Sequence, residues 1–125
     1  MTILARHFQA LLERYSDAVL TPQDDGTHVV SVPQLPLPTG WNRSVVDISF
    51  LVPAGYPQAV PDCFWTAPGL ALAHGGAPQN TGQQFTPGIP GDWVWFSWHP
   101  GTWNPNSDSL LTYLNVIRKR LNEPV

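Results

Sequence analysis

Residues 45–65, VVDISFLVPAGYPQAVPDCFW, constrain the fold more than any other stretch of the chain. In the first half of this stretch, apolar residues recur at every second position: Val46, Ile48, Phe50 and Val52. A period of two predicts an antiparallel strand with one buried face. The corner at 53–57, PAGYP, and Pro61 after it can continue neither a helix nor a central sheet ladder. The stretch therefore predicts a strand, a rigid corner and a second strand that includes Cys63 to Trp65.

Amphipathic helices are predicted at both ends of the chain. Residues 2–16 place apolar side chains on one helical face: Leu4, Phe8, Leu11, Leu12 and Tyr15. Thr2 is the expected N-cap, and His7 lies at the edge of the apolar face, as a half-exposed helix histidine. The last helix has an equivalent face: Leu110, Leu114, Ile117 and Leu121.

The start and end of the last helix also carry signals. Asn106 or Ser107 is the expected cap, with Asp108 in the first turn. The cations at 118–120, RKR, suit the negative end of the helix dipole, and that placement is enough to explain the cluster.

Between the helices the chain alternates short strands with irregular segments. TPQDDG at 21–26 predicts a turn, and Thr27–Val32 predicts a short strand. The proline-rich residues 33–42 predict an extended arm or edge segment rather than a paired central strand. Residues 67–92 predict a long irregular loop, which is ordered only if 70–72 and Phe85 pack inward. WVWFSW at 93–98 favours a strand.

Composition limits the possible classes of protein. The chain has 125 residues, of which 12% are charged, and a net charge of −3, which excludes the electrostatic footprint of a nucleic-acid-binding protein. Its single Cys cannot form an internal disulfide and suits a reducing compartment. Charged residues interrupt the N-terminal apolar positions, so the sequence predicts no signal peptide, no membrane span and a cytoplasmic location. The four His residues show no metal-ligand spacing, so neither a metal site nor another cofactor is predicted.

Together these elements predict one α+β domain over residues 1–125. It would have an N-terminal helix, an antiparallel sheet of about four strands, a long loop and a C-terminal helix, with the helices on one side of the sheet.

The order of these elements resembles the ubiquitin-conjugating (E2, or UBC) fold. Tyr56-Pro57 with Pro61 resembles the Tyr-Pro strand end and proline-rich corner of E2 proteins, and Trp103-Asn104-Pro105 resembles their Trp-x-Pro motif. The segments LPTGWN, VPAGYP, FSWHP and WNPNSDSLLTYL are most similar to prokaryotic E2 family E. The resemblance implies that the gene of this chain lies in a bacterial operon beside E1-like, ubiquitin-like and peptidase genes. Some operons of this kind are linked to phage defence.

The resemblance also raises the question of the nucleophile. An E2 carries its catalytic Cys between a His-Pro-Asn motif and the Trp-x-Pro motif, because thioester chemistry needs a thiolate. Here His74-Gly75-Gly76 stands where His-Pro-Asn would be. Counting back from Trp103 by the usual distance between the catalytic Cys and the Trp-x-Pro motif leads to about Trp95, not to a Cys. The only Cys is Cys63, which is expected to be a small buried apolar residue.

Ser97 and His99 offer another chemistry. In an extended segment, residues two apart face the same side, so a Ser could be the nucleophile and a His its base, and the product would be an oxyester. Asp92 or Asp108 would have to supply the third member. The alternative interpretation is that Ser97 is a strand hydroxyl and that His99 hydrogen-bonds the corner after it.

Three functions therefore compete. The first is a non-catalytic module, similar to ubiquitin E2 variants, that binds a ubiquitin-like protein or an E1-like or E1–E2 partner. Its expected contact residues are Trp41, His74, Trp93, Trp95 and Trp98. The second is an active, unconventional E2 that uses Ser97 with His99, or Cys63. The third is a Trp-rich carbohydrate-binding module, which the terminal helices and the reducing context disfavour.

Overall fold

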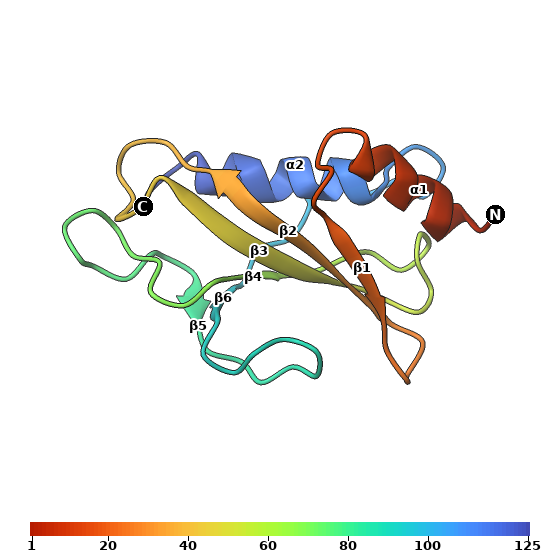
Figure 1. The fold of residues 1–125 in the computed structure, drawn as a ribbon, viewed down its shortest axis with the longest axis horizontal. Coiled ribbons are helices and arrows are strands. Elements are labelled where there is room, and N and C mark those ends of the chain that lie inside the picture. Colours follow the sequence, from red (N-terminus) through yellow and green to blue (C-terminus); the bar gives the residue numbers. More distant parts are fainter.

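The computed structural model describes all residues, 1–125, as two helices and a single sheet. The elements follow one another in this order: α1 (Ile3–Leu12), β1 (Val19–Pro22), β2 (His28–Pro36), β3 (Val45–Val52), β4 (Phe64–Thr66), β5 (Thr81–Gly82), β6 (Val94–Phe96) and α2 (Leu110–Leu121). Both helices lie on the same side of the sheet (Figure 1). The α+β class and the terminal helices are confirmed, and the arrangement is consistent with a UBC-like fold. No helix has the length and hydropathy needed to cross a membrane.

The sheet has six strands rather than about four. Their order is β1-β2-β3-β4-β6-β5, and every pairing is antiparallel. The two additional strands, β1 and β5, form the edges of the sheet, and neither was predicted from the sequence. Gly82 in β5 and Pro22 in β1 have low strand propensity. Pairing with the neighbouring strand, and not local propensity, therefore keeps these segments extended.

Strand β2 corrects the prediction for the proline-rich segment. Residues 33–36 were expected in an unpaired arm or an edge, but they continue β2, and Leu35 and Pro36 pair with Val46 and Val45 of β3. The register shifts between Val32 and Leu35. This bulge accommodates Pro33, which has no N–H to donate, at a point beyond the residues that β1 pairs.

The inner face of the sheet, which the helices cover, carries the larger core. The predicted alternation of β3 is confirmed, since Val46, Ile48, Phe50 and Val52 are all buried. Phe50 stacks edge-on against Tyr113 of α2, with ring centroids 5.0 Å apart. Leu114 and Ile117 complete the predicted face of α2 and are fully buried.

Helix α2 begins later than predicted. Ser109, not Asn106 or Ser107, is the N-cap, and it forms a reciprocal capping box with Thr112. Asp108 therefore precedes the helix and accepts a hydrogen bond from the backbone N–H of Asn104. At the other helix, Thr2 is confirmed as the N-cap, but α1 ends at Leu12, so Tyr15 lies beyond it.

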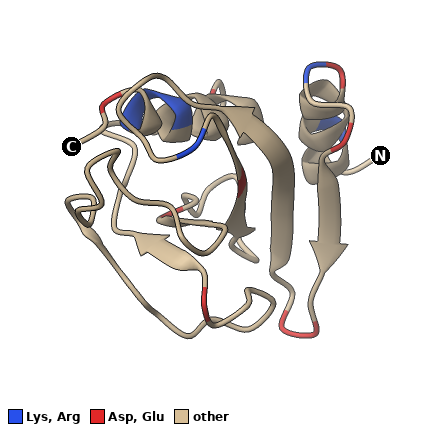
Figure 2. Ribbon diagram, turned by 60° about the vertical axis from the view of Figure 1, so that its left-hand side comes forward, with Lys and Arg blue, Asp and Glu red and all other residues tan.

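The cation cluster at the end of α2 is less uniform than the sequence indicates. Arg118 and Lys119 are exposed, but Arg120 is only 2% exposed. Its guanidinium donates hydrogen bonds to the carbonyls of Gln79, Glu123 and Val125, and its Cζ lies 5.3 Å from the centroid of Phe96. Figure 2 shows the Lys and Arg residues as short separate segments of the ribbon.

The outer face of the sheet carries a second, smaller core. Val29 and Trp65 from the sheet pack with Ile89, which comes from the long loop. The part of the loop after β5 lies on the side of the sheet opposite the helices (Figure 1). Leu70 and Leu72 pack inward as predicted, whereas Phe85 was predicted wrongly, because its side chain is 83% exposed.

Candidate functional site

The candidate site lies where two proline-containing corners meet. The indole N–H of Trp103 donates to the carbonyl of Pro57 over 2.8 Å, and the rings of Trp103 and Tyr56 lie 6.3 Å apart. The hydroxyl of Tyr56 is 2.6 Å from Nδ1 of His7, which ties the first corner to α1. His7 is half-buried, as predicted. These contacts fix the Tyr-Pro corner against the Trp-x-Pro corner.

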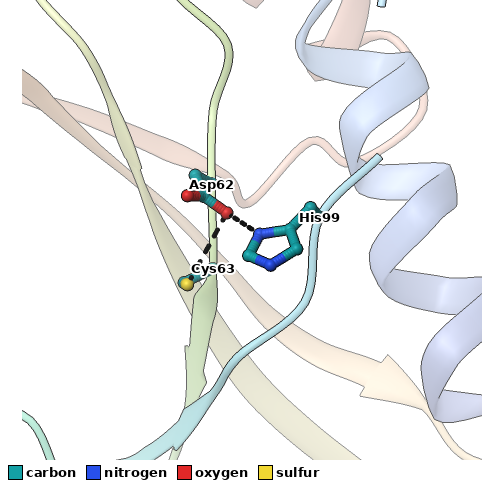
Figure 3. A group of neighbouring side chains, drawn as sticks. All are labelled: Asp62, Cys63 and His99. Atoms are coloured by element: carbon teal, nitrogen blue, oxygen red, sulfur yellow. Dashed lines mark hydrogen bonds and ion pairs between the residues drawn. The ribbon is translucent and has the colours of Figure 1, made fainter. Parts of the chain in front are cut away.

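Beside these corners, the structure brings together Asp62, Cys63 and His99 (Figure 3). Strands β4 and β6 pair Phe64 with Phe96, and the backbone N–H of Cys63 continues that ladder with a 3.0 Å bond to the carbonyl of Trp98. The pairing places residues 36 to 37 positions apart in the chain side by side. Nδ1 of His99 is bonded to Oδ1 of Asp62, and the Cys63 thiol donates to the same oxygen over 3.7 Å.

Cys63 is not the buried apolar residue that the sequence predicts. Its side chain is only partly buried, and its φ of 65° lies in the left-handed region, which is uncommon for a residue with a Cβ. The hydroxyl of Tyr113 in α2 donates to the Cys63 carbonyl over 2.8 Å and helps to hold this conformation. Burial raises the pKa of the Cys63 thiol; the N–H of Trp98 opposes that rise, and the carboxylate of Asp62 adds to it.

His99 is held by Asp62 rather than by Ser97. The imidazole is 62% exposed and the Asp62 carboxylate 59% exposed, and the two are joined by a hydrogen bond. Ser97 is half-buried; its backbone N–H donates to the carbonyl of Asn80, and its hydroxyl forms no hydrogen bond with His99. The partner that sequence reasoning sought at Asp92 or Asp108 is therefore Asp62.

The tryptophans proposed as contact residues fall into two groups. Trp41 is only 6% exposed, and its indole donates to the carbonyl of Leu121 over 2.7 Å, so it belongs to the core and is not an exposed anchor. Trp93, Trp95 and Trp98 are half-buried, the first two against the outer core and the third against the inner core. His74 is exposed on the long loop and accepts a bond from the N–H of Gly76.

Sequence reasoning missed Asp62 and the proximity of Cys63 to His99. No spacing rule predicts this cluster, because its members come from two distant segments that only sheet pairing brings together. A local signal was present nevertheless. Asp62 and Cys63 directly follow the corner proline Pro61, and His99 directly precedes another proline, so both segments have restricted backbones.

Comparison with known families supports the resemblance seen in the sequence. The model of the family described as prokaryotic E2 family E matches residues 6–124. No protein with a curated description and no solved structure is significantly similar to the chain. The match extends across both corners and both helices, and it favours an E2-like protein over a carbohydrate-binding module.

Proposed function

The chain belongs to prokaryotic E2 family E, and from this premise we propose that it is a binding module of a bacterial ubiquitin-like conjugation pathway. In this proposal, residues 1–125 act as one E2-like domain in the cytoplasm. The domain holds a ubiquitin-like protein, an E1-like or E1–E2 partner, or both, while the covalent chemistry takes place on another protein. A role in phage defence would follow from the pathway.

The position of the only thiol carries this proposal. E2 chemistry requires a nucleophile in the segment that leads to the Trp-x-Pro motif, and between β6 and Trp103 this chain has no Cys. Cys63 instead lies immediately before β4, with a carboxylate as its side-chain partner. A fold that retains the E2 architecture without a thiol at that position is the arrangement expected of a binding variant.

Exposed aromatic side chains support a binding role. Phe85 is 83% exposed at the surface of the long loop, and such an aromatic is a typical anchor for a protein interface. Trp93, Trp95 and Trp98 retain partly exposed surface, and His74 is exposed on the same loop as Phe85. These five residues replace the set proposed from the sequence, from which Trp41 is removed by its burial.

Intact mass measurement tests the proposal. The protein is incubated with ATP and with the E1-like and ubiquitin-like proteins encoded beside its gene, and then analysed by mass spectrometry and gel filtration. We expect co-elution with one of these proteins without a covalent adduct. Phe85→Ala should weaken the association about tenfold, whereas Val45→Ala, another exposed apolar residue, should not change it. Absence of binding to either protein would refute the proposal.

One observation favours a second candidate, an active E2 of unconventional chemistry. His99 has one ring nitrogen held by Asp62, which is how a carboxylate orients a general base in hydrolytic triads. In this candidate the Ser97 hydroxyl attacks the carbonyl of the ubiquitin-like thioester on the E1-like protein. An oxyester forms, the thioester bond breaks, and the departing thiol receives the proton that His99 removed from Ser97.

The two candidates differ in their covalent products. An adduct that hydroxylamine cleaves but reductants do not, and that Ser97→Ala abolishes, would show an oxyester. An adduct that reductants cleave and Cys63→Ala abolishes would show a thioester on Cys63. Either adduct would replace the binding-module proposal with an enzymatic one.

A further inference from the structure

The side chains of Asp62, Cys63 and His99 form a set of possible metal ligands, a property that the proposed binding role does not require. Its carboxylate oxygen, sulfur and ring nitrogen all lie within 4.8 Å of one another. Figure 3 shows one carboxylate oxygen of Asp62 joined by dashed lines both to the His99 ring and to the Cys63 sulfur, with the residues coming from the segment that leads into β4 and the one that follows β6. We propose that these residues form a site for a divalent transition metal of the zinc class. This inference is independent of the proposed role in conjugation.

The donor set selects the class of metal. One sulfur, one imidazole nitrogen and one carboxylate oxygen match the ligands of Zn²⁺ and of its spectroscopic substitute Co²⁺. Mg²⁺ and Ca²⁺ prefer oxygen ligands throughout and do not match. Three protein ligands with a fourth position left open is a common arrangement for Zn²⁺.

One of the three donor distances already matches a tetrahedral site, and a second requires the His99 ring to move. Metal–ligand bonds of about 2.0 Å to oxygen and about 2.3 Å to sulfur give a tetrahedral edge of about 3.5 Å. The Sγ of Cys63 lies 3.7 Å from Oδ1 of Asp62, close to that edge. His99 touches Asp62 directly, so its exposed ring would have to move away from the carboxylate to admit the ion.

The backbone of the cluster is fixed before any metal arrives. Cys63 is held in its left-handed conformation by the 3.0 Å bond to Trp98 and the 2.8 Å bond from Tyr113. Uncommon backbone conformations of this kind concentrate at functional sites, where the surrounding structure maintains them. The Cys63 backbone therefore presents its thiol from a fixed position, and only the exposed side chains of Asp62 and His99 would have to adjust.

The site is also accessible. Asp62 and His99 are each more than half exposed, and both line a pocket of about 260 Å³. The pocket extends to Trp103 of the second corner, so solvent and ions can reach Asp62 and His99. Binding forms metal–sulfur, metal–nitrogen and metal–oxygen bonds and releases the thiol proton to solvent. No electron is transferred.

Cobalt titration of protein without an affinity tag tests this inference. We expect a thiolate-to-cobalt charge-transfer band in the near ultraviolet, visible bands typical of tetrahedral Co²⁺, and loss of the signal when Zn²⁺ is added. Cys63→Ser should remove the charge-transfer band, and His99→Gln and Asp62→Asn should each weaken binding at least about tenfold. His74→Gln is the matched control, because that exposed histidine lies outside the cluster.

A second measurement on the unaltered protein does not depend on how the variants fold. Zn²⁺ should protect Cys63 from alkylation by iodoacetamide. At about a hundredfold excess over its dissociation constant, it should also raise the Tm by roughly 5–10 °C. The inference is overturned if Zn²⁺ leaves the alkylation rate unchanged, or if the cobalt band is absent or persists in folded Cys63→Ser.

Discussion

The two faces of the sheet are built differently. The inner face is covered by two amphipathic helices, and the two largest polar side chains buried there, Arg120 and Trp41, have hydrogen-bond partners, although the buried hydroxyl of Thr66 beside Phe64 has none. The outer face is covered by the irregular loop through Ile89, and the indole N–H of Trp65 is buried there without a partner.

This difference shows how each face came to be covered. A helix satisfies its own backbone and presents a continuous apolar stripe, so it can cover a sheet without burying unpaired backbone groups. A loop has no such periodicity, so it covers the sheet with isolated apolar side chains and not with a continuous apolar face. We therefore expect substitutions on the inner face to lower the free energy of unfolding more than substitutions on the outer face.

The largest expected effect compares matched truncations on the two faces. Leu114→Ala removes a fully buried side chain from the inner core, where rigid helices cannot collapse into the cavity, and should cost about 3–5 kcal/mol. Ile89→Ala on the loop should cost about 2 kcal/mol, because the loop can relax. Urea unfolding measures both free energies. Equal losses would show that the two faces are equally well packed.

A smaller effect compares the same polar deletion on each face. Trp41→Phe removes an indole that donates to the Leu121 carbonyl and leaves that acceptor unpaired. Trp65→Phe removes an indole N–H that has no partner. The volume change is the same, so Trp41→Phe should cost about 1–3 kcal/mol more in free energy of unfolding. A larger loss for Trp65→Phe would mean that the outer indole is bonded in solution.

The smallest effect concerns pH at the edge of the inner core. Burial, and to a lesser extent the charge of Arg6, lowers the pKa of His7 below its ordinary value of 6.5. The unfolded chain therefore binds a proton more readily than the folded chain, and stability falls as the pH decreases through 6.5. Thermal unfolding between about pH 8 and pH 5 should show a steeper loss in the natural protein than in His7→Gln. Parallel curves would contradict this assignment.

Local sequence pattern was a reliable guide where an element is continuous and amphipathic. The alternation of β3, the apolar faces of the two helices and the N-cap at Thr2 were all predicted from residues within a few positions of one another. The start of α2 was predicted less well, because Asn106, Ser107 and Ser109 are all acceptable caps in sequence. Only the reciprocal bonds with Thr112 select Ser109.

Local sequence pattern predicts less of the candidate site. His99 and Cys63 could be singled out by type, and Tyr56 and Trp103 by motif. The pairing of His99 with Asp62 could not be predicted, since these residues are 37 positions apart and meet only through the register between β4 and β6. The same limit led to the wrong expectation that Phe85 packs inward and that Trp41 is exposed.

By itself, the sequence determined the α+β class, both helices, the central strand and the two proline corners. These features depend on short-range periodicity and on the fixed backbone of proline, which act before any tertiary contact forms. Only the tertiary structure decided the edge strands, the burial of Trp41 and Arg120, and the meeting of Asp62, Cys63 and His99. Each of these results from contacts between segments far apart in the chain, whose free energy is gained only when the sheet closes.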